Sequence, residues 1–160
     1  MVYNVLDVSC EAINYSNEKG YGISNLKLQK ILYFIQAYFL ITVDEKCFKE
    51  KIEAWDFGPV VPEVYSEFKQ YGAGNIPSVS NYMIRDKNHP WNYEKKKFDS
   101  SVINENDKKR IRAVIDEFAD YSATYLVSLT QSQAPWYDAY QKYKNNEITV
   151  DAIKEFFNNE

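Results

Sequence analysis

Residues 25–42 read NLKLQKILYFIQAYFLIT, and their apolar side chains recur at the spacing of a helix. The strongest stripe is formed by Leu28, Ile31, Leu32, Ile35 and Phe39. Residues three and four positions apart share one face of an α-helix, so the stripe predicts a helix with a strongly buried side. Apolar residues on its flanks, namely Tyr33, Phe34, Tyr38 and Leu40, make it apolar almost all round. Such a helix lies in the middle of its domain, and we expect a central core helix here with Ser24 as its N-cap.

Weaker helical patterns lie on both sides of this segment. We expect helices at about 5–15, from Pro62 to about 71, from about Glu105, and after Ser122, Pro135 and Thr149. Serine and threonine are suitable N-caps, and proline is tolerated in a first helical turn. In the helix that opens near Pro62, the expected buried face consists of Val61, Val64, Tyr65 and Phe68.

Two regions favour extended structure. Residues 51–57 alternate loosely and precede Gly58-Pro59, where we expect a tight turn. Residues 82–85 and 95–99 are expected to form the strands of a hairpin, with a turn at 86–90. The predicted fold class is mainly α (α+β). We expect one compact helical domain over residues 1–160, built around the central helix, with a small β-hairpin or extended element.

The composition limits the class of protein. The 160 residues include 19 Lys and Arg against 23 Asp and Glu, which gives a net charge of −4. A dedicated nucleic-acid binder normally carries a basic surface, so we do not expect a nucleic-acid partner. The longest apolar stretch, 31–43, is shorter than the ~20 residues that span a bilayer. Residues 1–10 show no signal-peptide pattern, and Cys10 and Cys47 form no CxxC motif. We therefore expect reduced thiols, a cytoplasmic location and no membrane partner.

Two short basic runs, 95–97 and 108–112, interrupt the acidic background. Acidic residues flank both runs, at Glu94, Asp99, Glu105 and Asp107. Mixed charge of this kind is typical of a solvated face and not of a phosphate-binding site.

The residue types that usually carry catalysis are absent or isolated. His89 is the single histidine and stands in a polar stretch without metal-ligand spacing, so we expect it to be exposed. No HExxH, GxSxG, P-loop or GxGxxG motif occurs. We expect no catalytic residue, no metal and no cofactor. An enzyme of unassigned chemistry stays open as an alternative, because the separation of a carboxylate pair is a spatial property.

Aromatic residues are unusually frequent. Three Trp, 14 Tyr and 9 Phe make up 16% of the chain. Most individual tyrosines are expected in or near the core, but the total leaves room for an aromatic surface patch. Tyrosine is enriched at protein–protein interfaces, so the composition suits a binding protein.

Three blocks of sequence occur in a distinctive order. The first is LKLQKILY at 26–33, and the second is IEAWDFGPVVPEVY at 52–65, followed by FKQYG at 68–72. The third joins Leu129-Thr130 and Ala134-Pro135-Trp136 to Ile148-Thr149, Ile153 and Phe156-Phe157. In this order and spacing the blocks resemble the Panacea domain, the SocA-like antitoxin family of bacterial chromosomes, plasmids and prophages. The WxxGPVVP run at 55–62 is the most specific part of the resemblance.

The resemblance implies a mostly helical domain that acts as the antitoxin of a two-gene toxin–antitoxin pair. Members neutralise a cognate protein toxin, usually by direct binding. One branch is an adaptor that delivers its toxin to an ATP-dependent protease, which is the alternative function. No enzymatic activity or cofactor is implied. The family often has a Thr-His pair and then an acidic residue before Pro-Trp, whereas this chain has Gln131 and Gln133 there.

The candidate partner-binding residues come from the second and third blocks. They are Trp55, Asp56, Phe57, Pro62, Glu63, Thr130, Gln131, Gln133 and Trp136. Each segment sets an aromatic residue beside proline, whose rigid backbone lowers the entropy lost on binding. The hypothesis requires the two segments to lie together in space. Polar residues of the blocks are expected on the surface, namely Lys27, Gln29, Asp56, Glu63 and Gln131.

Overall fold

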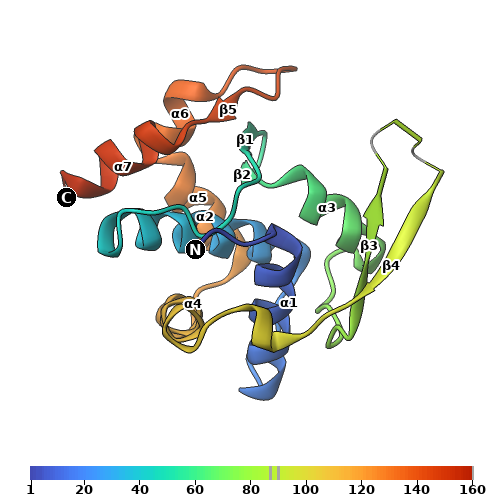
Figure 1. The fold of residues 1–160 in the computed structure, drawn as a ribbon. Helices are drawn as coiled ribbons and strands as arrows, with labels where there is room; N and C mark the ends of the chain where they lie inside the picture. The colour runs from blue at the N-terminus through green and yellow to red at the C-terminus, as the bar shows by residue number, and fades with distance from the viewer. Residues whose placement is uncertain (87, 90, 160) are drawn as a thin grey trace.

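The computed structural model describes residues 1–86, 88–89 and 91–159. The described chain forms seven α-helices, two short 3-10 helices and two small antiparallel sheets (Figure 1). The helices are α1 (Val5–Glu18), α2 (Asn25–Thr42), α3 (Pro62–Phe68), α4 (Glu105–Glu117), α5 (Ala123–Gln131), α6 (Ala134–Ala139) and α7 (Val150–Asn158). The 3-10 helices are η1 (Lys69–Tyr71) and η2 (Ser100–Val102). The predicted mainly α fold of the α+β class is confirmed.

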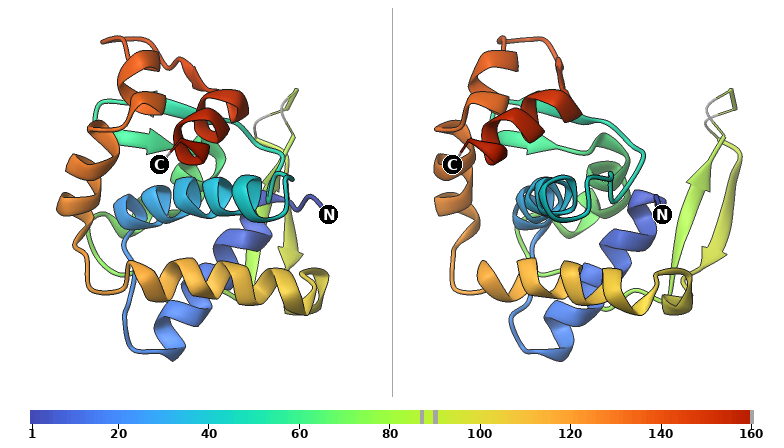
Figure 2. Two further views of the ribbon diagram at one scale, coloured as in Figure 1. Left: turned by 90° about the vertical axis from the view of Figure 1, so that its left-hand side faces the viewer. Right: turned by 60° about the vertical axis from the view of Figure 1, so that its left-hand side comes forward.

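Helix α2 is the centre of the structure. Its predicted stripe of Leu28, Ile31, Leu32, Ile35 and Phe39 is no more than 1% exposed at any position. Helices α1, α3, α4, α5 and α7 all pack against α2 and enclose it from different sides (Figure 2). The expected N-cap is also confirmed, because the Ser24 hydroxyl accepts a hydrogen bond from the backbone N–H of Lys27 at 3.2 Å. A helix that is apolar all round has no face to give to water, and the fold therefore wraps around it.

The remaining helix starts follow their sequence signals. Ser122 and Thr149 cap α5 and α7, and prolines stand in the first turns of α3 and α6. The expected buried face of α3 is wrong at one position, because Tyr65 is 40% exposed while Val61, Val64 and Phe68 are buried. The ring of Tyr65 packs edge-on against Trp55 with ring centroids 5.2 Å apart. An aromatic neighbour outside the core therefore holds Tyr65 at the surface.

A three-stranded sheet packs on α2 and lies above it in both views of Figure 2. Its strands β1 (Ile52–Trp55), β2 (Gly58–Val60) and β5 (Glu147–Ile148) are antiparallel in the order β2-β1-β5. The expected turn at Gly58-Pro59 is displaced, since the chain reverses at residues 56–57 and Gly58 already pairs with Trp55. Gly58 has φ of 106°, a value that L-residues with a side chain rarely adopt, and this conformation lets the strand restart directly after the turn.

The second sheet is a hairpin of β3 (Asn81–Arg85) and β4 (Tyr93–Lys97), whose strand β3 lies beside α3 while β4 lies on the outside (Figure 1). The predicted hairpin is confirmed, although its second strand begins at Tyr93 and not at Lys95. The turn expected at 86–90 includes Lys87 and Pro90, which lie outside the described residues. His89 is exposed, as expected.

Both cysteines are buried free thiols. Burial raises the pKa of Cys10 and of Cys47, which disfavours the reactive thiolate at neutral pH. Among the described residues, no helix has the length and apolarity needed to cross a bilayer.

Candidate partner-binding face

The β1–β2 hairpin is tied to the region where α5 meets α6. The side-chain amide of Gln131 donates to the carbonyl oxygen of Asp56 at 2.9 Å. The indole N–H of Trp136 donates to the carbonyl oxygen of Trp55 at 2.8 Å. The structure thus brings together the two segments that the hypothesis requires. Two direct hydrogen bonds to backbone fix the hairpin turn in place, whatever side chains the turn carries.

A third tie comes from the chain just after α6. The Tyr140 hydroxyl donates to the Asp56 carboxylate at 2.6 Å, and the Tyr140 ring stacks on Trp136 with centroids 4.5 Å apart. The hydrogen bond to this carboxylate raises the pKa of Tyr140. Asp56 is therefore oriented by a phenol although it lies at the surface. Tyr140 was not among the predicted site residues, because its approach to Asp56 depends on how α6 packs.

The nine candidate residues divide by exposure. Phe57 is 68% exposed at the tip of the hairpin, Asp56 is exposed next to it in the turn, and Glu63 is exposed in the first turn of α3. Four more are half-buried, namely Trp55, Pro62, Gln131 and Trp136. Thr130 is fully buried and Gln133 is 7% exposed. The buried Gln133 accepts a hydrogen bond from the Tyr33 hydroxyl of α2 at 2.8 Å, which anchors the start of α6 to the core helix.

A buried lysine lies beneath the hairpin. Lys30 on α2 has no exposed surface, and its ammonium group donates to the carbonyl oxygen of Pro59 at 3.1 Å. Burial lowers the pKa of Lys30 to about 7. The sequence pattern of α2 did not single out this residue as buried. Lys30 therefore supports strand β2 from below with a hydrogen bond whose donor titrates near neutral pH.

Substitution of Gly58 is expected to destabilise the hairpin. A Cβ at Gly58 would lie 2.8 Å from Cε of Lys30 and 2.9 Å from Oγ1 of Thr130. Gly58→Ala combines this overlap with an unfavourable φ, and we expect a loss of about 2–3 kcal/mol in the free energy of unfolding. Gly20 is the matched control, because its φ is +78° and a Cβ added there would meet no atom within 4 Å. Gly20→Ala should cost about 1 kcal/mol from the backbone alone. Equal losses by urea denaturation would show that the overlap at Gly58 is relieved without cost.

The surface position expected for Gln29 is wrong. Gln29 is 1% exposed, and its carbonyl oxygen accepts from the backbone N–H of Val61 at 2.9 Å. Its amide donates to Asn25 at 2.8 Å, and Asn25 donates to the carbonyl oxygen of Tyr65 at 3.1 Å. The first N–H groups and the last C=O groups of a helix need partners outside the helix, and these two amides supply one of each. Asn25 and Gln29 therefore join α2 to both ends of α3.

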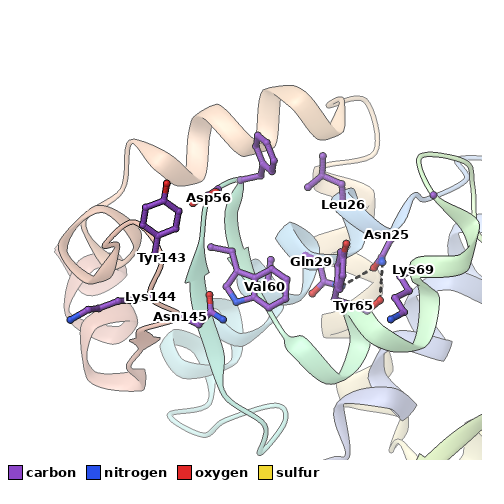
Figure 3. A pocket seen from close by; sticks show the side chains of 13 residues that line it. Asn25, Leu26, Gln29, Asp56, Val60, Tyr65, Lys69, Tyr143, Lys144 and Asn145 are labelled. Atoms are coloured by element: carbon purple, nitrogen blue, oxygen red, sulfur yellow. Dashed lines mark hydrogen bonds between the residues drawn. The ribbon is translucent and has the colours of Figure 1, made fainter.

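An open groove of about 470 Å³ runs beside the hairpin. Figure 3 shows the side chains that line it, together with the hydrogen bonds that join Asn25 to Gln29 and to Tyr65. Trp55, Phe57 and Tyr65 supply aromatic surface, and Lys69 and Lys144 stand at its edges. Leu26, Tyr65 and Tyr143 belong to the groove but were not predicted as site residues. They come from α2, from α3 and from the turn between α6 and β5, so no local sequence signal could have grouped them.

The described residues offer no obvious place for a metal ion. Within 1–86, 88–89 and 91–159, no group of three or more His, Cys, Asp or Glu side chains is arranged to hold one. His89 lies beside Trp91 with ring centroids 5.9 Å apart and is exposed. The candidate face is thus made of aromatic, amide and carboxylate groups, which suit recognition by contact.

Comparison with known proteins identifies the family. Residues 28–137 match the family described as antitoxin SocA-like, Panacea domain. The chain belongs to this family. Antitoxin SocA of Caulobacter vibrioides (strain NA1000 / CB15N) is 48% identical over 50 residues, which is 31% of this chain and 27% of that protein. The aligned stretch thus spans about a quarter of the length of this relative. No solved structure gives a significant match.

The Panacea match contains both halves of the face. The β1–β2 hairpin, α5 and the first part of α6 with Trp136 all lie inside the matched residues, whereas Tyr140 lies just beyond them. Membership of this family supports an antitoxin role. The family assignment also points to a non-enzymatic role.

Proposed function

We propose that the protein neutralises a cognate protein toxin by direct binding, through the face formed by the β1–β2 hairpin and the α5–α6 region. The observation that carries this proposal is the exposure of Phe57. Phe57 is 68% exposed at the tip of a turn whose backbone is held by Gln131 and Trp136. An exposed aromatic side chain on a fixed backbone loses little conformational freedom on binding, which is the condition for an efficient anchor.

The surroundings of Phe57 suit an interface. Asp56 is an exposed polar group that lines the groove with Trp55 and Phe57, Glu63 is exposed at the start of α3, and the groove offers a recess for a partner side chain. An apolar centre with a polar rim is the usual arrangement of stable protein–protein contacts. Stable neutralisation requires an interface of roughly 1,200–2,000 Å² in total, so neighbouring parts of the surface would take part as well.

The buried candidates receive a different role in this proposal. Thr130 donates its hydroxyl proton within α5, with the carbonyl oxygens of Leu126 and Val127 as acceptors, and Gln133 bonds to α2. Neither presents its side chain to a partner. We assign them to positioning the face, and assign contact with the toxin to Asp56, Phe57, Glu63 and the exposed parts of Trp55, Pro62, Gln131 and Trp136.

The net charge of −4 would favour association with a toxin that is basic. A basic toxin would be steered toward an acidic antitoxin by long-range attraction, and the association rate would fall with salt. We further propose that residues 1–160 form one antitoxin domain that acts in the cytoplasm.

The proposal is tested by growth rescue. Each neighbouring gene is expressed alone, and the one whose product arrests growth is co-expressed with variants of this protein. Phe57→Glu and Asp56→Lys, checked for folding by circular dichroism, are expected to lose rescue because they place a charge or the opposite charge at the centre of the interface. Ile41→Glu is the control, since Ile41 is 42% exposed on α2.

The outcomes separate the two modes of action that the family suggests. Direct neutralisation leaves the toxin present and bound, so its level on an immunoblot stays constant during rescue. A toxin level that falls only in strains with an active ATP-dependent protease would replace this proposal with the adaptor function. Full rescue by both Phe57→Glu and Asp56→Lys would move the interface to another surface.

A further inference from the structure

The β3–β4 hairpin presents a free strand to solvent. All five residues of β4 are exposed, and the hairpin extends away from the helices in Figures 1 and 2. Its contact with the rest of the chain runs mainly through β3, where Tyr82 is buried and its hydroxyl donates to Asp7 of α1 at 2.8 Å. Strand β3 thus fixes the hairpin, and β4 is left on the outside.

The hydrogen-bond pattern shows which backbone groups are available. Met83 donates its backbone N–H to the carboxylate of Glu67 on α3 at 3.2 Å, so this N–H points away from β4. Bonds from Asp86 to Asn92 and from Phe98 to Ser80 close the ladder at its two ends. In an antiparallel pair, inward and outward groups alternate along each strand. The pairs Met83–Lys95, Asn81–Lys97 and Arg85–Tyr93 are therefore those whose backbone groups face outward.

The outer edge of β4 consequently exposes the backbone N–H and C=O of Tyr93, Lys95 and Lys97. Within the part of the chain that the structure describes, no backbone or side-chain group bonds to them. Successive side chains of a strand point to opposite faces, so these three share one face. Lys96 lies on the other face, with its ammonium group 5.9 Å from the centre of the Tyr82 ring.

We propose that β4 is a docking edge that accepts an extended acidic segment of a partner protein as a third strand. The partner strand would carry acidic residues at positions i and i+2, opposite Lys95 and Lys97, and an apolar residue next to Tyr93. Opposite charges on directly facing strand positions attract, and the backbone hydrogen bonds supply sequence-independent affinity. Tyr93 is 59% exposed and Trp91 is 75% exposed, so apolar surface is available toward the tip.

The lysines of β4 favour an acidic partner strand over a second copy of this chain. Two antiparallel β4 strands paired edge to edge about Lys96 would place Lys95 against Lys97 twice and Lys96 against itself, and pairing about Lys95 would place the two Lys95 residues against each other. Lysine on an edge strand is a common device against such self-pairing. The same three charges attract an acidic strand. This docking edge and the toxin-binding face belong to different elements, and neither proposal depends on the other.

The binding experiment uses the full chain and a synthetic probe. The probe is a fluorescein-labelled ten-residue peptide in which glutamate and valine alternate and which ends in tyrosine. Binding is followed by fluorescence anisotropy, and saturable binding is expected. The same peptide with lysine in place of glutamate is expected not to bind. Lys95→Glu combined with Lys97→Glu should weaken binding by roughly tenfold or more, because two attractive pairs become repulsive. The matched control is Lys19→Glu with Lys46→Glu, which changes the net charge equally at two other exposed lysines.

A second pair of variants separates strand pairing from simple charge attraction. Lys95→Thr and Lys95→Pro both remove the charge, but only proline removes the outward N–H. Proline is tolerated where the N–H of an edge strand faces solvent, so the hairpin should survive. Lys95→Pro is therefore expected to bind the probe several-fold more weakly than Lys95→Thr.

The same logic applies to the probe. Methylation of its backbone nitrogens along one edge should abolish binding, and methylation along the other edge should not. Equal affinity of Lys95→Pro and Lys95→Thr, or retained binding of both methylated peptides, would overturn the strand-docking proposal. Absence of saturable binding to the unmodified glutamate probe would overturn it as well, and so would dimerisation of the protein through β4 in sedimentation experiments.

Discussion

Leu32→Ala is expected to lower the free energy of unfolding by about 2–5 kcal/mol. Leu32 has no exposed surface and lies within the hydrophobic core on α2. The substitution removes buried methyl and methylene groups and leaves a cavity that neighbouring helices fill only in part. Because α2 is packed from several sides, little freedom remains for the core to collapse around the missing side chain.

The measurement is urea denaturation followed by circular dichroism, with Ile41→Ala as the control. Ile41 lies on the same helix but is 42% exposed, so its truncation should change stability by no more than about 0.5 kcal/mol. A loss below that value for Leu32→Ala would mean that the central stripe does not form the core.

Lys30→Met is expected to raise stability at pH 7 by about 1–3 kcal/mol. Burial lowers the pKa of Lys30 from 10.5 to about 7. At pH 7 the unfolded chain therefore keeps Lys30 protonated, whereas the folded protein binds this proton only in part. At ~1.36 kcal/mol per pKa unit, the resulting penalty is about 4 kcal/mol. Methionine removes this penalty and fills similar space. It also leaves the Pro59 carbonyl without its donor, which costs about 1–3 kcal/mol.

The pH dependence gives the sharper test. A lysine with a lowered pKa in the folded state destabilises the fold fully below about pH 7 and progressively less as the pH rises toward 10.5. The wild-type protein should therefore gain about 2 kcal/mol relative to Lys30→Met between pH 7 and pH 9. Subtraction of the two proteins at each pH cancels the other titrating groups. A difference that stays constant with pH would show that Lys30 keeps its ordinary pKa in the folded protein.

Some features followed directly from the order of the residues. The stripe of α2, the caps at Ser24, Ser122 and Thr149, and the prolines that open α3 and α6 are local signals, each confined to a few neighbouring positions. Local signals act through steric limits and hydrogen bonds along one element, so they can be recognised without knowing what packs against that element. The three family blocks likewise predicted the family without any geometry, because their spacing is a property of the chain.

Other features depended on contacts between distant residues. Gln29 and Lys30 are polar but buried, because the N–H of Val61 and the carbonyl oxygen of Pro59 require hydrogen-bond partners and α2 supplies them. Tyr65 is exposed because Trp55 offers it a surface outside the core. The meeting of Asp56 with Gln131 and Tyr140 spans more than seventy positions in sequence. Helical periodicity and chain order determined which elements form, whereas pairing between elements decided which polar groups were buried and which aromatic side chains were left on a binding face.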